Sequence, residues 1–509
     1  MRRRFIPVLA ALGALVIGPS LAPAQDVPRA LSLADAIRLA RANSPTYRQF
    51  LNDEDPADAD VRSAYGGLLP TINSNAGINY TRAGSQTFAN QVFRNSSQLG
   101  SSYSISASLG ISYGQFLAPK RSKAQRRATE ENIAGAGVNL VADVSSQYLA
   151  VLRAEANVAV VEQQVARNVQ FLTQTQARFQ VGRGTMVDVR QAEVSKSASD
   201  VQLLRARQAA TNAKIELLRR MGMPTDADIA SVRLTDSFTL TAPHWDLATL
   251  RAQAHGENPQ LRAAVAQEEA ASIGVTSAKA QYLPSFSIST GISGYTQQST
   301  SVDPLLANAL SSAKGQAQNC GFQNAILERL TSPHPAPNGG IIDDCNAFAG
   351  LDASGTALQQ DVAQRIRDSN TGWPFGYTRQ PWSISFGVSL PIFDGFRRAA
   401  AVSAARAQED DAREALRARR IDVDGQIQSG LLGVETAWQA ATIADSNRAA
   451  AGERLRLAQQ RFDIGSGTSL EIADAQNAVT QAEFDYVAAV FDYHTAVVGL
   501  EATVGRPIR

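Results

Sequence analysis

Two stretches far apart in the chain place acidic side chains directly after a Gly-x-Gly-Thr turn. The first, RFQVGRGTMVDVRQAE, covers residues 178–193, and the second, RFDIGSGTSLEIADAQ, covers residues 461–476. A carboxylate in the first turn of a helix caps free N–H groups and suits the helix dipole, which would explain Asp188 and Glu471. Asp474 lies beyond that range, and its i, i+3 spacing places it on one helix face with Glu471. Capping therefore leaves Asp474 without a role.

The glycines of these turns predict how two helices are joined. Gly182 and Gly465 stand where a left-handed residue ends a helix, and each is followed by a second glycine, Gly184 or Gly467. A nucleotide-binding loop is excluded, because the third glycine of that motif is missing and the preceding segment is helical rather than a strand.

The threonines that follow predict where the next helices begin. Thr185 and Thr468 are N-cap candidates. Thr468 forms a capping box with Glu471, and Thr185 forms a weaker version with Asp188. We therefore expect two helical hairpins, each reversing at a capped turn.

The rest of the chain offers no catalytic chemistry. It contains no Walker loop, nucleophile elbow or HExxH motif, and the four histidines, at 244, 255, 334 and 494, lack ligand spacing. The formal net charge is +1, which does not suggest nucleic-acid binding. We expect a protein that is not an enzyme and needs no metal or cofactor, so energy for any transport comes from a partner.

The elements that carry the turns are predicted to be very long helices. No proline occurs between Pro119 and Gly182, and a helix from Lys120 to Gln180 would run about 90 Å. Apolar residues recur every seven positions, which implies left-handed supercoiling against neighbouring helices. The recurring positions of the first hairpin include Val144, Val151, Leu172, Phe179, Val187 and Val194, and those of the second include Ile427, Val434, Leu455, Phe462 and Leu470.

Four segments alternate apolar and polar residues as β-strands do: residues 71–81, 103–114, 285–295 and 382–393. A half-buried sheet of a soluble domain would also alternate. The polar positions here are small and uncharged, and aromatic residues mark some ends, which favours strands of a membrane barrel with a lipid-facing band. Beyond the N-terminus the chain has no apolar run of 18 residues.

The chain is predicted to begin with an export signal and to contain an internal tandem repeat. A basic start, a short apolar run and an Ala-x-Ala site predict a signal peptide over 1–24, cleaved after Ala24. LSLADAIRLARANSP (31–45) resembles WDLATLRAQAHGENP (245–259), and both regions continue with a Leu-Pro break and a strand pair. We therefore divide the mature chain into repeats at 25–245 and 246–509.

A polar stretch over about 296–379 interrupts the second repeat and is expected to be a long extracellular loop. Both cysteines, Cys320 and Cys345, lie inside it. In an exported protein such a pair is usually bridged, although two free thiols are the alternative. The stretch could serve as a plug, a surface receptor or padding.

The mature chain resembles the TolC family of outer-membrane exit ducts. The resemblance rests on LSLADAIRLARANSP, YLPSFSIS, SLPIFDGFRRAA and RFDIGSGTSLEIADAQNAV, in this order and partly duplicated. It implies a mixed α/β membrane protein that is a homotrimer, with four strands per chain in one twelve-stranded β-barrel and a long α-helical coiled-coil barrel in the periplasm. It also implies two partners, a periplasmic adaptor (membrane fusion) protein and an inner-membrane pump of the RND or ABC type, with outer-membrane lipid around the barrel.

The resemblance also assigns roles to the turns. It implies that the hairpin tips dock the adaptor, and that Glu471 and Asp474 form a cation-attracting ring at the periplasmic mouth. In the family, an aromatic hydroxyl, an arginine and an aspartate lock that mouth. Asp188 matches the aspartate, whereas Phe462 and Gly467 replace the other two, so we expect closure to depend on packing of Phe462 near Phe179 or on Arg183.

Two classes of function follow from these observations. The first is an exit duct of the Gram-negative outer membrane, extending into the periplasm. It would serve tripartite efflux of small toxic compounds or, alternatively, type I protein secretion. The second is a periplasmic coiled-coil scaffold or adaptor, which would normally show one hairpin between β-rich modules rather than two hairpins with a strand pair each.

Overall fold

The computed structural model describes residues 30–88, 91–224, 229, 232–331 and 336–508, so the predicted signal peptide at 1–24 lies outside the described residues. The chain forms two compact units. We call them the helical unit, which comprises Met1–Val61, Arg121–Gly274 and Ala405–Arg509, and the sheet unit, which comprises Arg62–Lys120 and Val275–Ala404.

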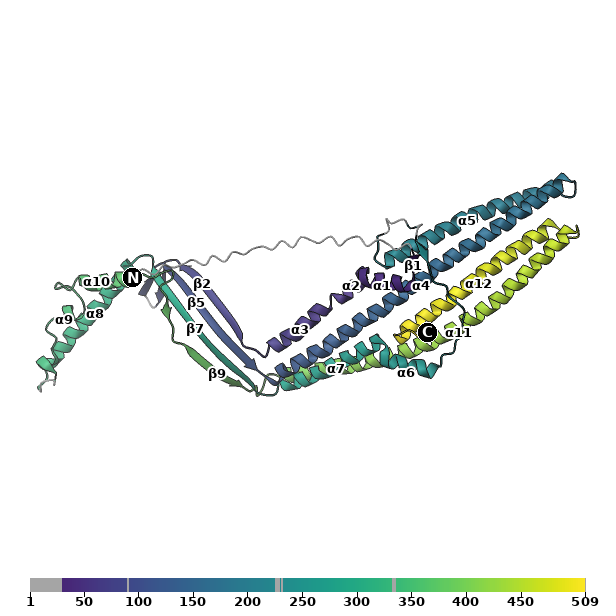
Figure 1. The fold of residues 1–509 in the computed structure, drawn as a ribbon. Coiled ribbons are helices and arrows are strands. Elements are labelled where there is room, and N and C mark those ends of the chain that lie inside the picture. The colour runs from purple at the N-terminus through teal and green to yellow at the C-terminus, as the bar shows by residue number, and fades with distance from the viewer. Residues whose placement is uncertain (1–29, 89–90, 225–228, 230–231, 332–335, 509) are drawn as a thin grey trace, which may run out of the picture. The chain divides into compact units, whose positions relative to one another are not determined.

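Two long helical hairpins dominate the helical unit (Figure 1). The first joins α4 (Tyr113–Gln180) to α5 (Met186–Arg220), and the second joins α11 (Arg397–Asp463) to α12 (Ser469–Val504). The predicted hairpins are confirmed, although α4 begins at Tyr113 rather than at Lys120 and includes Pro119. No helix in the described ranges combines the length and the apolar composition needed to cross a membrane.

Shorter elements flank the hairpins. Before α4 come α1, α2 and α3, and before the second strand pair come α6 and α7. Two short strands, β1 and β6, pair in parallel. The bounds are α1 Leu33–Asn43, α2 Pro45–Leu51, α3 Glu54–Gly66, α6 Leu247–Glu257, α7 Pro259–Ala280, β1 Ala30–Leu31 and β6 Arg233–Leu234.

The core of the helical unit forms where these short elements meet the hairpins. One cluster surrounds Val144 of α4 and another surrounds Ile427 of α11, and both residues are fully buried. The Tyr148 hydroxyl lies 2.9 Å from the carbonyl oxygen of Leu31 and 2.8 Å from an Asp236 carboxylate oxygen. Burial raises the pKa of Tyr148 to about 12, so the hydroxyl keeps its proton and ties α4 to the start of the chain.

Part of the predicted seven-residue seam does not face this core. Val187, Val194 and Leu470 follow the turns on α5 and α12, and they are 74, 67 and 60% exposed. An apolar seam that is exposed over two turns or more is typical of a helix that packs against another chain.

The sheet unit is built on an antiparallel sheet in the order β2 (Thr71–Thr81), β5 (Gln98–Ile111) and β7 (Ser285–Ser299). Strands β8 (Thr378–Arg379) and β9 (Ser383–Ser389) both pair with β7, and β3 (Gly84–Phe88) pairs with β4 (Gln91–Asn95) in a separate hairpin. All four predicted strands are confirmed. The last is shorter than predicted, because β9 ends just before Leu390-Pro391.

The strand register separates two faces of the sheet. Ile105 pairs with Ile292, and Ile288 pairs with Phe386, so these side chains share one face. That face is apolar and exposed in the single chain: Ile72, Ile78, Ile384 and Phe386 are each more than 60% exposed. The opposite face contains Asn, Ser, Gly and Thr at most positions.

The segment that we expect to be a long extracellular loop, at about 296–379, connects β7 to β8, and much of it is helical. It contains α8 (Asp303–Leu327), a 3₁₀ turn (Pro337–Gly340), α9 (Cys345–Phe348) and α10 (Gln360–Ser369), which together we call the lobe. Leu, Ala and Gln favour a helix over α8, and Pro304 suits its first turn. The predicted Cys320–Cys345 disulfide is confirmed and joins α8 to α9.

Candidate functional site at the hairpin tips

Both hairpins reverse through the same backbone motif. Gly182 and Gly465 have φ values of 70° and 82°, the left-handed conformation that the sequence predicts. The following amides, of Arg183 and Ser466, donate to carbonyl oxygens five residues earlier at 2.9 Å, as in a Schellman motif. The second glycine is also required, since a Cβ on Gly467 would lie 2.9 Å from the Phe462 nitrogen.

The N-terminal caps of α5 and α12 reverse the expected order, in which the capping box at Thr468 is the stronger one and that at Thr185 the weaker. At the first turn the Asp188 amide donates to Thr185 Oγ1 at 3.2 Å, and the Thr185 amide donates to Asp188 Oδ2 at 3.0 Å, so the capping box is complete. At the second turn only the Glu471 amide donates, to Thr468 Oγ1 at 3.2 Å. The Glu471 carboxylate instead lies 3.5 Å from Arg461.

A polar link joins the two hairpins at their tips. Ser469 Oγ at the start of α12 donates a hydrogen bond to Asp188 Oδ1 at the start of α5. This bond, together with the bonds from Thr185, holds the pKa of Asp188 below its usual range. Asp188 is therefore a carboxylate at neutral pH, and it belongs to both hairpins.

Arg178 forms a second link, which the sequence did not reveal. Its guanidinium donates to the carbonyl oxygens of Phe462 and Asp463 at 2.5 and 3.0 Å, and it lies 4.0 Å from the centre of the Phe462 ring. Phe462 is buried and packs against Phe171 with 5.8 Å between ring centres. We call Arg178, Phe462, Asp463, Asp188 and Ser469 the clasp.

The other two residues predicted to pack at the gate lie outside the clasp. Phe179 is 40% exposed. Arg183 is exposed and makes no hydrogen bond or ion pair with its side chain among the residues that the structure describes. Arg178 takes the position that we had expected of Arg183, because it lies on the helix, one turn before the reversal, and faces α11.

Polar contacts continue along the hairpins behind the clasp. Gln174 donates to Asp463 at 2.5 Å, and Arg167 lies 3.3 Å from Glu483, with both side chains 18% exposed. A polar cavity of about 550 Å³ lies beside them between α4, α11 and α12. Near the tips, hydrogen bonds beside this cavity and a small apolar cluster of Phe171, Ala192, Phe462 and Ile472 together join the two hairpins.

Glu471 and Asp474 differ in their surroundings. Glu471 is half-buried and close to Arg461, which partly balances its charge. Asp474 is exposed and forms no ion pair with any residue in the described ranges. Within one chain, the charge of Asp474 is therefore not balanced by an ion pair with any described residue, unlike that of Glu471.

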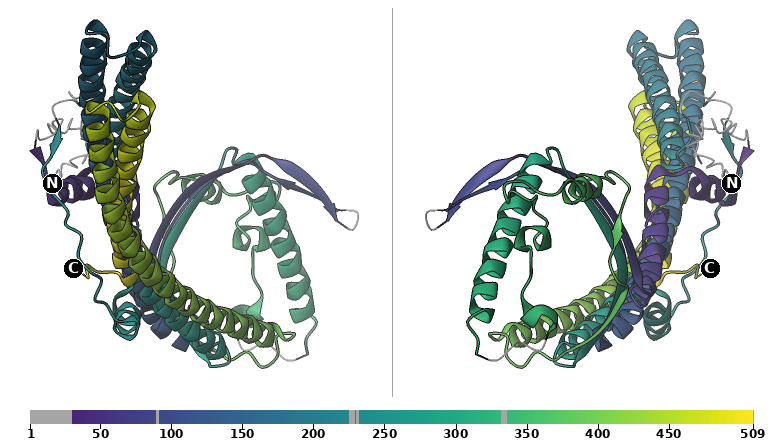
Figure 2. Two further views of the ribbon diagram at one scale, coloured as in Figure 1. Left: turned by 90° about the vertical axis from the view of Figure 1, so that its right-hand side faces the viewer. Right: turned by 90° about the vertical axis from the view of Figure 1, so that its left-hand side faces the viewer.

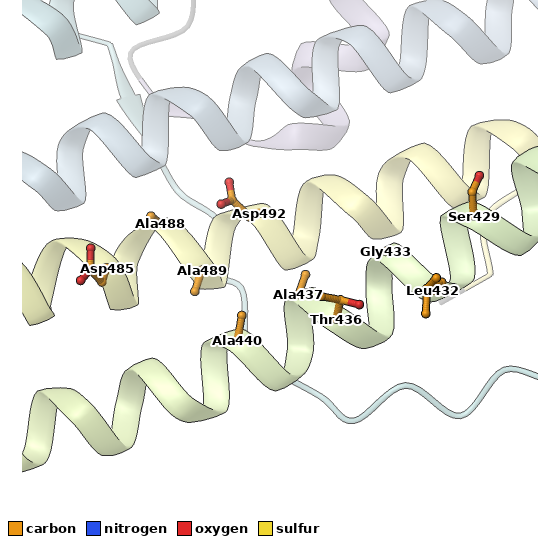
Figure 3. Close-up of a pocket in the computed structure, with 10 residues that line it drawn as sticks. All are labelled: Ser429, Leu432, Gly433, Thr436, Ala437, Ala440, Asp485, Ala488, Ala489 and Asp492. Atoms are coloured by element: carbon orange, nitrogen blue, oxygen red, sulfur yellow. The ribbon is translucent and has the colours of Figure 1, made fainter.

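A shallow groove runs along the second hairpin, between α11 and α12 (Figure 3). One part has a volume of about 580 Å³ and is lined by Gly433, Ala437, Ala440, Ala488 and Ala489, with Asp485 and Asp492 also present. Small side chains allow another helix to approach closely.

Among the described residues, no group of three or more His, Cys, Asp or Glu side chains is placed to hold a metal ion.

Comparison with known sequences relates the chain to one family. Residues 36–223 and 350–506 match the family described as outer membrane efflux protein. The outer membrane protein TolC of Vibrio cholerae is 25% identical over 279 residues, which are 54% of this chain and 61% of TolC, so the match spans less than two thirds of that relative. The outer membrane efflux protein BepC of Brucella suis is 23% identical, over 84% of this chain and 83% of its own.

Comparison with solved structures gives the same fold. The outer membrane protein VceC of Vibrio cholerae superposes with a TM-score of 0.67, over 94% of this chain and 97% of its own, at 15% identity. Identity this low establishes similarity of fold alone.

Proposed function

Because this chain belongs to the outer membrane efflux protein family, we propose that it is the outer-membrane exit duct of a tripartite efflux system. In this proposal it carries small toxic compounds from an inner-membrane pump to the outside. The signal peptide at 1–24 would direct it to the Gram-negative outer membrane, with the helical unit in the periplasm.

The observation that carries this proposal is the division of the sheet into two faces. One face exposes large apolar side chains such as Ile72, Ile78 and Phe386, which a soluble protein would have to cover. The other face is polar, and β2, β5, β7 and β9 place no Asp, Glu, Lys, Arg or His on it. In a membrane barrel the apolar face would contact lipid and the polar face would contact water, so each face would have a suitable environment.

The number of strands supports a homotrimer. Strands β2, β5, β7 and β9 cannot close around a water-filled passage, since a barrel of useful width needs many more strands. Three copies supply twelve. The exposed seam positions on α5 and α12 would then pack between copies, forming a coiled-coil barrel from the hairpins, and the two halves of each chain would be the tandem repeats at 25–245 and 246–509.

We propose that the clasp and the acids of α12 together form the periplasmic gate. The clasp ties the second hairpin to the first and favours the closed state. Glu471 and Asp474 of three copies would make a ring of six carboxylates, which attracts cations and sets selectivity. In this proposal Asp188 is part of the clasp rather than of the carboxylate ring, since its carboxylate accepts hydrogen bonds from Ser469 and Thr185.

The partners in this proposal bind the helical unit. The hairpin tips, at 181–185 and 464–468, are exposed enough to dock an adaptor, and the alanine-lined groove of Figure 3 offers room for an adaptor helix. An RND or ABC pump would supply the energy for transport.

The proposal is tested by isolating the protein from outer membranes. We expect a heat-modifiable trimer that forms ion-conducting channels in planar bilayers. A monodisperse soluble monomer in the periplasm would refute the barrel and the duct together.

Deletion of the gene separates efflux from protein secretion. Loss of the duct should sensitise cells to small toxic compounds and leave the secreted proteins unchanged. Loss of one large secreted protein, with unaltered sensitivity, would assign the duct to type I secretion instead.

A further inference from the structure

The lobe has one apolar face that no residue in the described part of the chain covers. Phe322, Ile326 and Leu330 follow one another at intervals of four residues and are 66, 47 and 51% exposed. Such spacing places them along one side of α8 and its C-terminal turn. The opposite side carries the buried Ala313 and Cys320, and it is held to the rest of the lobe by the disulfide.

The charge pattern of the lobe distinguishes this face from a solvated surface. Within α8 the only charged side chains are Asp303 and Lys314, and Glu328 and Arg329 follow directly after the helix, before Leu330. The much shorter α10 carries four charged residues, all exposed, and Arg365 pairs with Asp361 at 2.8 Å. The solvent-exposed helix α10 of this lobe is therefore charged, whereas α8 has the composition of a surface that contacts another protein.

The position of α8 limits what could cover it. Within the sheet unit, α8 lies beyond the ends of the strands (Figure 1) and on the side toward which the sheet curves (Figure 2). In a barrel closed from several such sheets, lipid contacts the convex side. The concave side holds only the lumen and the same helix of the neighbouring copies.

We propose that the α8 faces of three copies pack against one another over the outer mouth and narrow the exit of the duct. This proposal rests on the proposed trimeric channel. In a three-fold assembly, residues near the axis meet their own counterparts, so Phe322 and Ile326 of each copy would contact those of the other two. The disulfide keeps each α8 rigid enough to hold this position.

Chemical cross-linking tests the contact directly. Phe322→Cys or Ile326→Cys adds one free thiol per copy, since the native cysteines are bridged, and a short bis-maleimide then joins thiols that lie close together. Arg365→Cys on the charged face of α10 is the matched control. We expect covalent dimers on a denaturing gel for the first two variants and monomers for the control.

A conductance measurement tests the consequence. The double variant Phe322→Asp/Ile326→Asp places like charges where the three faces meet, which should separate them and raise single-channel conductance in planar bilayers. Asp361→Asn on α10 should leave conductance at the wild-type value.

The outcomes separate this proposal from the one on which it rests. If trimers assemble and conduct, but neither α8 variant cross-links above the Arg365→Cys control, the α8 contact is refuted and the duct stands. Unchanged conductance in the double aspartate variant would refute the narrowing of the exit. If the wild-type chain forms neither trimers nor channels, the proposed function falls, and this inference falls with it.

Discussion

Replacing Arg178 by alanine should weaken the closed state of the hairpin tips. The substitution removes two hydrogen bonds to the carbonyl oxygens of Phe462 and Asp463 and the contact with the Phe462 ring. Hydrogen bonds from a charged donor contribute about 1.5–3 kcal/mol and a cation–π contact about 0.5–1 kcal/mol. The low ends of these ranges sum to about 3.5 kcal/mol. Because Arg178 is only half-buried, we discount this to about 2 kcal/mol per chain, which shifts the equilibrium roughly 30-fold toward the open state.

Single-channel recording of the purified protein in planar bilayers measures this shift. Arg178→Ala should conduct more and spend more time open than the wild type. Arg178→Lys should be intermediate, since lysine keeps the charge and loses the planar fork that reaches two carbonyl groups. Arg183→Ala is the control, because Arg183 lies in the exposed turn that follows α4 and its side chain has no partner among the described residues.

The reasoning fails if Arg178→Ala conducts like the wild type, or if Arg183→Ala opens the channel equally. The first result would mean that the hairpins stay together without the clasp. The second would mean that any loss of positive charge at the tip relaxes the gate.

Three further changes test other parts of the structure. The pKa of Asp188 is lowered, so its link to Ser469 is intact above the ordinary aspartate pKa of about 3.9 and is lost as pH falls through the lower pKa of the folded state. Channel recordings should therefore show opening below about pH 4. The variant Asp188→Asn should be more open at neutral pH, and its opening should not depend on pH in this range. Asp474→Ala should reduce cation preference and relieve block by multivalent cations without loss of trimer stability; unchanged selectivity and block would remove Asp474 from the ring. Cys345→Ser removes about 3 kcal/mol of local constraint, so the lobe should be cut faster by protease while trimer assembly and export persist; failure to assemble would make the lobe a structural element.

Much of the fold could be predicted because its repeats have a clear period. The alternation in 71–81 predicted β2 with its observed bounds, since successive side chains of a strand point to opposite faces and a sheet with one apolar and one polar face therefore requires strict alternation. The seven-residue spacing placed Val144 and Ile427 in the core. Both turns could be predicted because left-handed glycines at 182 and 465 leave few alternatives.

Neither the lobe nor the clasp could be predicted from the sequence, and the physical reason differs between the two. In the sequence of α8 the apolar residues are interrupted by Gly315, Gly321 and a run of Ser, Asn and Gln, so its apolar face is hard to distinguish from an irregular segment. Arg178 binds backbone carbonyl groups nearly three hundred positions away. Every residue has a backbone carbonyl group, so the sequence does not indicate which one an arginine will bind. The capping boxes were ranked by residue type, whereas the neighbouring Arg461 decides where the Glu471 carboxylate lies.

Strands β2, β5, β7 and β9 contain no aspartate, glutamate, lysine, arginine or histidine on either face. In the proposed barrel, the inner wall would consist of short hydroxyl and amide groups, which offer a solute many weak contacts and no specific binding site. Passage through that barrel would then depend on its width rather than on affinity, for cationic, anionic and neutral molecules alike. Selection among solutes would have to take place before they reach the barrel.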